Sequence, residues 1–278
     1  MVATSHISVR NLSVHFPLGR QLFGSPPVVR AVDDVSLEIP KGSFFGLVGE
    51  SGSGKTTLGR AILKAAPITT GQVLYRDDEV EYDLGSISKE QLKDYRSRAQ
   101  LIFQDPYAAL SPRMTVRDII AEPLEVMGIT DTRAATDDRV REMASKCRLN
   151  LEHLRRFPHA FSGGQRQRIS IARALVCNPK FVVADESVAA LDVSIQADIL
   201  NLLESLRGEL MNTFLFISHD LSVVAHICDT VAVMYLGTLV ESAPTRSLFS
   251  NPSHPYTCLL YTSPSPRDVE ESRMPSSA

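Results

Sequence analysis

The sequence has little of what a disulfide-bonded, secreted or membrane-spanning protein needs. Its 278 residues include only four cysteines, Cys147, Cys177, Cys228 and Cys258, and no two of them lie close together. This spacing excludes the paired motifs of zinc and redox sites and suits a reducing compartment. No apolar run reaches the roughly 18 residues of a membrane span. The polar start of the chain predicts no signal peptide, so any membrane association is expected to come from partners.

The sequence also lacks a large excess of charge of either sign. The chain has 29 basic and 32 acidic residues, and its net charge of −3 argues against nonspecific binding to nucleic acid. An apolar share of 44% is enough for a sizeable core. The length suits one domain with a subdomain, or two small domains.

A glycine-rich loop is the first positive signal. Gly49–Thr56 reads GESGSGKT, between an expected strand at Phe44–Val48 and an expected helix at Thr57–Ala66. In such a loop the backbone amides close on phosphates, Lys55 reaches the β and γ phosphates, and the Thr56 hydroxyl binds Mg²⁺. The predicted phosphate-binding residues are Gly49, Glu50, Ser51, Gly52, Ser53, Gly54, Lys55, Thr56 and Thr57.

A second glycine turn lies in Phe161–Arg168, FSGGQRQR. Ser162 is typical of a helix N-cap, and the helix is expected to run through Val176. Free amides and the positive helix end there favour an anion. Without further context, an ordinary capped helix would explain the same residues.

An apolar strand ending in two carboxylates follows at Phe181–Glu186, FVVADE. Ligands of open α/β sheets lie at the carboxyl ends of the strands. We expect Asp185 to bind Mg²⁺, through water, and Glu186 to activate the attacking water.

Together these motifs resemble the nucleotide-binding subunit of an ABC transporter. Gln104 in LIFQDP, Asp192 in AALD and His219 in FISHD complete the family's motifs in order. The resemblance implies that Gln104 senses Mg²⁺ and couples to the membrane subunit. It implies that Asp192 crosses a dimer interface and that His219 lies near the γ-phosphate.

The second glycine turn gains a role from the same resemblance. Ser162, Gly163, Gly164 and Gln165 match the signature that caps ATP bound to the opposite subunit. The family also stacks adenine on an aromatic side chain after the first strand. Phe16 is the candidate, and Phe23 is the second choice.

The expected fold is an α/β P-loop NTPase, with a RecA-like core, an antiparallel β layer and an inserted α-helical subdomain. We expect a single ATPase domain over residues 1–257. Its core would comprise 1–104 and 177–243, its helical subdomain about 105–176, and its C-terminal segment would start at 244–257. Strands are expected at Ile7–Phe16, Val32–Ile39, Val73–Tyr75, Leu101–Phe103, Phe181–Ala184, Phe214–Ile217, Thr230–Tyr235 and Leu239–Glu241, and a helix with a capping box at Ser88–Arg98.

Longer strings point to one branch of the family. Gln104–Val116, Ala190–Leu203 and Pro244–Thr257 resemble the oligopeptide, dipeptide and nickel importers, and Tyr107 favours the second of their two paired ATPases. The resemblance implies ATP and Mg²⁺ as cofactors, ATP hydrolysis that powers import of short peptides or nickel, and a place on the cytoplasmic face of the inner (plasma) membrane. The implied partners are two permease subunits, a paralogous ATPase or a second copy, and an extracytoplasmic solute-binding protein. No nucleic acid is expected.

Two residues depart from the family pattern. Ser187 stands where a proline usually follows the catalytic glutamate, and Ala189 stands where the loop before Asp192 usually has serine. A proline would stiffen the turn, so Ser187 is expected to loosen the placement of Glu186 and to slow hydrolysis without abolishing it.

Features of the sequence argue against three functions other than transport. A soluble ABC ATPase acting on ribosomes or DNA would usually show two such domains or a long coiled coil, and neither is visible. Glu186 and His219 argue against a regulatory subunit that does not hydrolyse ATP. A P-loop GTPase would need an Asn-Lys-x-Asp motif, which is absent.

The end of the chain differs in character. Cys258–Asp268, CLLYTSPSPRD, reads like a translated transposon-end sequencing adapter, and Ser272–Ala278 like a translated flow-cell adapter. We therefore expect that the natural gene was read only as far as Thr257, that its natural C-terminus is missing, and that residues 258–278 have no function. The alternative is a disordered tail rich in serine and proline.

Overall fold

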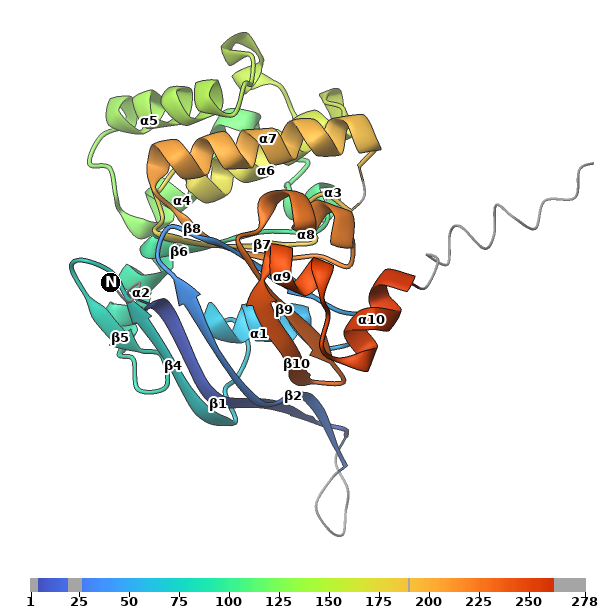
Figure 1. Ribbon diagram of the computed structural model, residues 1–278. Coiled ribbons are helices and arrows are strands. Elements are labelled where there is room, and N and C mark those ends of the chain that lie inside the picture. The colour runs from blue at the N-terminus through green and yellow to red at the C-terminus, as the bar shows by residue number, and fades with distance from the viewer. Residues whose placement is uncertain (1–4, 20–26, 190, 263–278) are drawn as a thin grey trace, which may run out of the picture.

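A computed structural model describes residues 5–19, 27–189 and 191–262. Two sheets form the framework (Figure 1). The antiparallel sheet has the order β2-β1-β4-β5, with bounds Val28–Pro40, Ser5–Pro17, Thr70–Arg76 and Glu81–Asp83. The second sheet has the order β10-β9-β3-β8-β7-β6, with bounds Thr238–Pro244, Thr230–Tyr235, Phe44–Val48, Thr213–Ile217, Phe181–Asp185 and Ala99–Ile102.

The second sheet is parallel except at one edge, where β10 pairs antiparallel with β9. The residues of β3, β7 and β8 are buried throughout, as expected for strands covered on both faces. Alternate residues enter two different clusters: Phe44 packs on the side of the large helices, whereas Phe45 packs toward the antiparallel sheet. This confirms the expected P-loop NTPase architecture.

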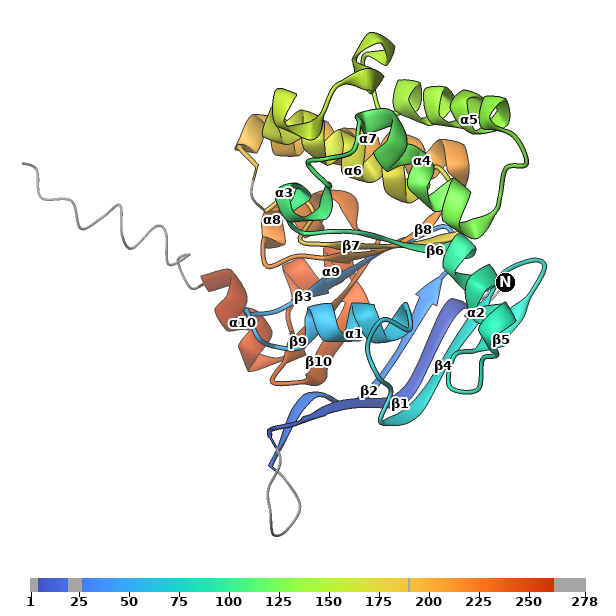
Figure 2. The ribbon, with the colours of Figure 1, turned by 180° about the vertical axis from the view of Figure 1, so that it is seen from behind.

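Helices fill both sides of the parallel sheet. One group, α3 to α7, covers one face: Pro106–Ala109, Val116–Met127, Arg133–Lys146, Gly163–Leu175 and Val193–Leu210 (Figure 1). Figure 2 shows α1, Lys55–Ile62, between the two sheets. The remaining helices are α2, Lys89–Arg98, α8, Leu221–Ile227, α9, Thr245–Ser250, and α10, Pro255–Thr262, together with 3-10 turns at Leu151–Arg155 and Pro158–Ala160. No helix within the described ranges is both long and apolar enough to cross a bilayer.

Most of the expected elements are present, with shifted ends. The expected capping box at Ser88 and Gln91 is formed, and Ser162, expected as an N-cap, forms a capping box with Gln165 as well. The helix expected to reach Ala66 ends at Ile62, because the chain turns at Lys64, where φ is 54°. Phe103 lies outside β6.

Two expectations about chain organisation stay predictions. The helices α3 to α6 lie between β6 and β7 along the chain, which is compatible with an inserted subdomain. Residues 258–262 of the tail form part of α10, and residues 263–278 lie outside the described ranges.

One buried histidine links the two sheets. His6 in β1 is 1% exposed, and its Nδ1 lies 3.0 Å from the Thr213 hydroxyl of β8. Its ring meets that of Tyr75 edge-on at 5.0 Å. Burial lowers the pKa of His6 from 6.5 to about 4.

This burial predicts acid sensitivity of the fold. Because the folded-state pKa is lowered, the unfolded chain takes up the proton first, so stability is lost as the pH falls from 6.5 to about 4. The parent should lose about 2 kcal/mol more unfolding free energy than the His6→Gln variant between pH 8 and pH 5. Urea unfolding at both pH values measures this difference, and parallel losses in the two proteins would contradict it.

Candidate active site

The glycine-rich loop joins β3 to α1 and is pressed between two backbone segments. Gly49 and Gly54 have φ of 148° and 103°, which other residues rarely adopt. A Cβ on Gly49 would lie 2.1 Å from the carbonyl oxygen of Met234, and one on Gly54 would lie 2.1 Å from that of Ala31. Both positions therefore require glycine for their backbone shape and for space.

Lys55 places a buried positive charge inside this loop. The residue is 4% exposed, and its Nζ donates to the carbonyl oxygens of Gly49 at 2.6 Å and Glu50 at 2.7 Å. Burial lowers the pKa of Lys55, against the opposing effect of nearby carboxylates. These bonding partners are neutral, so an anionic phosphate would supply the opposite charge that the ammonium lacks.

A carboxylate at the end of β7 meets the loop from the other side. Asp185 is 3% exposed, and its Oδ1 accepts a hydrogen bond from the Thr56 hydroxyl at 2.8 Å. Burial raises the pKa of Asp185, and the bond from Thr56 offsets part of the rise.

This oxygen pair fits Mg²⁺ in its chemistry. Hydroxyl and carboxylate oxygens are the hard ligands that Mg²⁺ prefers, and it often takes the rest from water and substrate phosphates. No group of three His, Cys, Asp or Glu suited to a metal occurs in the described part of the chain. The remaining ligands of such an ion would come from water and from the phosphates of a nucleotide.

Glu186 lies at the centre of a second cluster. Its Oε2 accepts a hydrogen bond from Gln104 Nε2 at 2.7 Å, and its Oε1 lies 3.4 Å from His219 Nδ1. The three residues follow β6, β7 and β8, whose carboxyl ends meet at one edge of the sheet. The side chain of Glu186 is 16% exposed and that of His219 is 52% exposed, so a substrate has access to both.

The backbone at Glu186 is held in an uncommon shape. Its φ is 45°, and its N–H donates to the carbonyl oxygen of Ile217 at 2.9 Å. The Ala189 N–H closes the following turn on the Glu186 carbonyl at 3.2 Å. Ser187 is 2% exposed, and its hydroxyl has no partner among the described residues. The effect of Ser187 and Ala189 on hydrolysis stays a prediction.

The second glycine turn starts α6 as expected, with Ser162 as its N-cap. No hydrogen bond or ion pair joins Ser162–Gln165 to the glycine-rich loop within the described ranges. The two glycines differ: a Cβ on Gly164 would lie 2.5 Å from Ile195 Cγ2 of α7, whereas one on Gly163 meets only Leu191 at 3.7 Å. Packing within one chain therefore explains Gly164 but not Gly163.

The remaining predicted residues lie at the surface. Phe16 is at the end of β1 and is 38% exposed, while Phe23 lies outside the described residues. Asp192 precedes α7 without capping it through its side chain, and its neighbour Val193 is 82% exposed.

Sequence reasoning missed two kinds of contact at the loop. Its walls are backbone atoms of Ala31 and Met234, which leave no mark in the side-chain pattern. The hydroxyl of Tyr256 accepts a hydrogen bond from the Glu50 N–H at 3.0 Å. The only sequence signal for this second contact is the family-like string Pro244–Thr257, and that resemblance predicts no contact with the loop.

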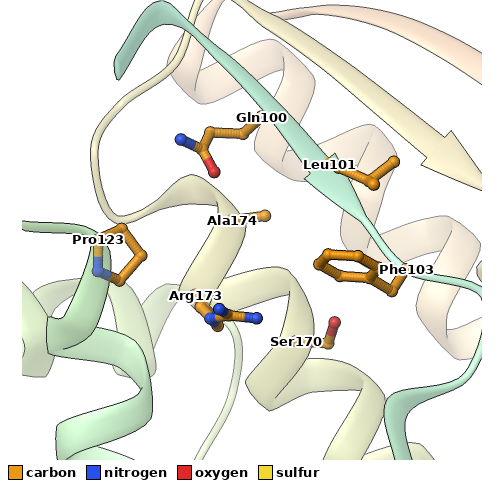
Figure 3. Close-up of a pocket in the computed structure, with 7 residues that line it drawn as sticks. All are labelled: Gln100, Leu101, Phe103, Pro123, Ser170, Arg173 and Ala174. Atoms are coloured by element: carbon orange, nitrogen blue, oxygen red, sulfur yellow. The ribbon is translucent and has the colours of Figure 1, made fainter. Parts of the chain in front are cut away.

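A cavity of about 170 Å³ lies away from these residues, between β6, α4 and α6 (Figure 3). Its lining comprises Gln100, Leu101, Phe103, Pro123, Ser170, Arg173 and Ala174. Phe103 is 40% exposed, and Arg173 is held by Glu122 at 2.8 Å. Nearby on α3, Tyr107 is 63% exposed, under the guanidinium of Arg166.

Comparisons with known proteins agree with this geometry. The family described as "ABC transporter" matches residues 32–189. The oligopeptide transport ATP-binding protein OppF of Bacillus subtilis is 48% identical over 270 residues, covering 96% of this chain and 86% of the relative. The dipeptide transport ATP-binding protein DppF of Lactococcus lactis subsp. cremoris is 48% identical over 268 residues, covering 95% and 83%. These matches extend past Thr257, and the adapter origin of the tail stays a prediction.

Solved structures show the same fold. The dimeric, post-hydrolysis ATP-binding cassette MJ0796 bound to ADP and Pi is similar with a TM-score of 0.74 and 26% identity, covering 86% of this chain and 99% of that one. The cbiO1 protein of Clostridium perfringens reaches a TM-score of 0.74 at 22% identity, covering 97% and 99%.

The contact between Gly164 and Ile195 predicts a difference between the two glycines. Gly164→Ala should lower the unfolding free energy by about 1–2 kcal/mol, because the methyl group overpacks against α7. Gly163→Ala has ordinary space and serves as the matched control. Chemical denaturation measures both, and addition of Ile195→Ala should recover part of the loss at Gly164. Equal stability of the two glycine variants would refute this packing argument.

Proposed function

Since this chain belongs to the ABC transporter family, we propose that it is the ATP-binding and ATP-hydrolysing subunit of an importer of short peptides. The observation that carries the proposal is the position of Glu186 between Gln104 and His219, near the Thr56–Asp185 pair. The choice of peptides is supported by the names of the relatives, which are oligopeptide, dipeptide and peptide import ATP-binding proteins.

The loop residues would hold the triphosphate. Lys55 exchanges its bonds to the Gly49 and Glu50 carbonyls for bonds to phosphate oxygens, which gives its buried charge an anionic partner. Amides of Gly49–Thr57 close around the phosphates. Phe16, exposed at the end of β1, is the proposed stacking surface for adenine.

Glu186 would orient the attacking water and accept its proton. Gln104 and His219 fix the carboxylate from two sides, and His219 also donates toward the transferred phosphate. Thr56, Gln104 and Asp185, the last through water, are the proposed ligands of Mg²⁺. When bound, that ion neutralises part of the phosphate charge.

The site is proposed to be completed by another subunit. Ser162–Gln165 cap a nucleotide bound elsewhere, and the exposed Asp192 approaches the partner's site. Two observations support this: among the described residues of one chain, no hydrogen bond or ion pair joins Ser162–Gln165 to the loop, and the similar cassette is dimeric. The second subunit is a paralogous ATPase or another copy of this chain.

The membrane partners are proposed to be two permease subunits, with a solute-binding protein on the far side. The cavity beside Phe103, together with Glu122, which pairs with its lining residue Arg173, and the exposed Tyr107, offers a docking place for a short permease helix. Such docking would hold the chain at the cytoplasmic face of the plasma membrane. It would link Gln104, one residue after Phe103, to the permease.

The role of Glu186 predicts a catalytic loss without a binding loss. In a complex reconstituted with its partners, Glu186→Gln should lower the rate of phosphate release at least 100-fold, because the amide cannot take the proton of water. ATP binding by the chain should stay within about twofold. Glu204→Gln, an exposed residue of α7, is the control and should leave both quantities unchanged. Turnover at the parent rate in Glu186→Gln would exclude the general-base role.

The composite site predicts a separation of binding from turnover. Gly163→Asp places a carboxylate at the start of α6, where the structure has ordinary space for a Cβ and the helix end favours negative charge, so it should repel a nucleotide without unfolding the helix. ATP turnover of the reconstituted complex should fall more than tenfold, while ATP binding by the isolated chain stays unchanged. Loss of both would mean that Ser162–Gln165 act only as a helix start.

A further inference from the structure

The C-terminal segment reaches back to the glycine-rich loop. Tyr256, at the start of α10, is 8% exposed, and its hydroxyl accepts a hydrogen bond from the Glu50 N–H at 3.0 Å. Its ring lies 4.2 Å from that of Tyr235, at the end of β9. Figure 1 shows α10 beside the hairpin of β9 and β10. This hairpin contacts the glycine-rich loop, because the Gly237 N–H donates to the Ser53 carbonyl at 3.0 Å. A residue 206 positions away in the chain thus fixes the second residue of the loop.

The position of Tyr256 is itself fixed by β10. The two carboxylate oxygens of Glu241 accept hydrogen bonds from the N–H groups of Ser253 at 2.8 Å and His254 at 3.0 Å. The Nδ1 of His254 then accepts from the Tyr256 N–H at 3.1 Å. These bonds fix the position of the first residues of α10. They thereby hold the hydroxyl of Tyr256 next to the Glu50 N–H. All of these residues precede Cys258, where the adapter-like tail begins.

Both backbone polar groups of Glu50 form hydrogen bonds. Its carbonyl accepts from Lys55 Nζ, and its N–H donates to Tyr256. Lys55 also donates to the Ser53 hydroxyl at 3.4 Å, so its three ammonium protons are all in use and at least one of these bonds must be given up when Lys55 turns to phosphate. The bond from Glu50 to Tyr256 involves no atom of Lys55, so it persists when Lys55 turns away.

We propose that Tyr256 is a positioning residue for nucleotide binding, whose hydroxyl holds the first turn of the phosphate loop in place while Lys55 binds the phosphates. The C-terminal segment is then a working part of the ATP site, and Glu241 acts on the site through it. This inference rests on the proposed assignment of Gly49–Thr56 as the phosphate loop.

Removal of one hydroxyl tests the proposal. Tyr256→Phe keeps the ring but leaves the Glu50 N–H without its acceptor, so the Kd of the full chain for ATP should rise roughly 3- to 10-fold. In the reconstituted complex KM should rise by a similar factor, while kcat at saturating ATP stays unchanged. Tyr235→Phe, which removes a hydroxyl from the ring next to it, is the matched control and should leave Kd unchanged.

A second variant tests the path through β10. Glu241→Gln keeps the side-chain shape but replaces one of the two acceptor oxygens, so it should also raise the Kd for ATP. If it acts through Tyr256, the double variant should bind ATP no more weakly than Tyr256→Phe alone. A multiplicative loss would show that Glu241 does not act through Tyr256.

The outcomes separate this inference from the function on which it rests. If Lys55→Ala loses ATP binding while Tyr256→Phe binds as tightly as the parent, Tyr256 only packs the segment and the proposal is wrong. Equal losses in Tyr256→Phe and Tyr235→Phe would also overturn it, because they would indicate general packing. If Lys55→Ala retains the parent affinity, the phosphate-loop assignment itself fails.

Discussion

Parallel pairing of the central strands is the constraint on which the site depends. β6, β7, β8 and β3 run in one direction, so Gln104, Glu186, His219 and the loop at Gly49 all emerge at the same edge. A slip of one residue would also turn every core side chain to the opposite face. The packing of the two hydrophobic clusters therefore keeps the reactive groups in register, and one core residue, Ile217, also accepts a hydrogen bond from the Glu186 N–H.

Two buried charged groups, Lys55 and Asp185, lie at the loop. Lys55 is bonded to neutral oxygens, and Asp185 is bonded to a hydroxyl, so neither buried group has an opposite charge as its hydrogen-bonding partner. In the proposed function, a triphosphate with a metal ion would provide a partner for each of them. Burying such charges costs folding free energy, but it places them in advance where the charge of the ligand has to be stabilised.

Local signals explain how much of the structure could be predicted from the sequence. The capping box at Ser88, the N-cap at Ser162 and the buried strands are predictable because each depends on neighbours in the chain, and the order of the site residues is predictable through the family resemblance. Contacts between distant segments were not. The end of α1 at Ile62, the contact of Gly164 with Ile195 and the bond of Tyr256 to Glu50 depend on tertiary packing.

The start of α6 shows how local and distant requirements divide between adjacent glycines. Its capping box uses the Gln165 N–H, and the first amides of a helix have no partner within the helix. Gly164 is small because α7 passes close to it, so its identity says nothing about a ligand. Gly163 has ordinary space around it and no packing reason to lack a side chain. The proposed composite site would therefore give Gly163, rather than the glycine pair as a whole, its reason to lack a side chain.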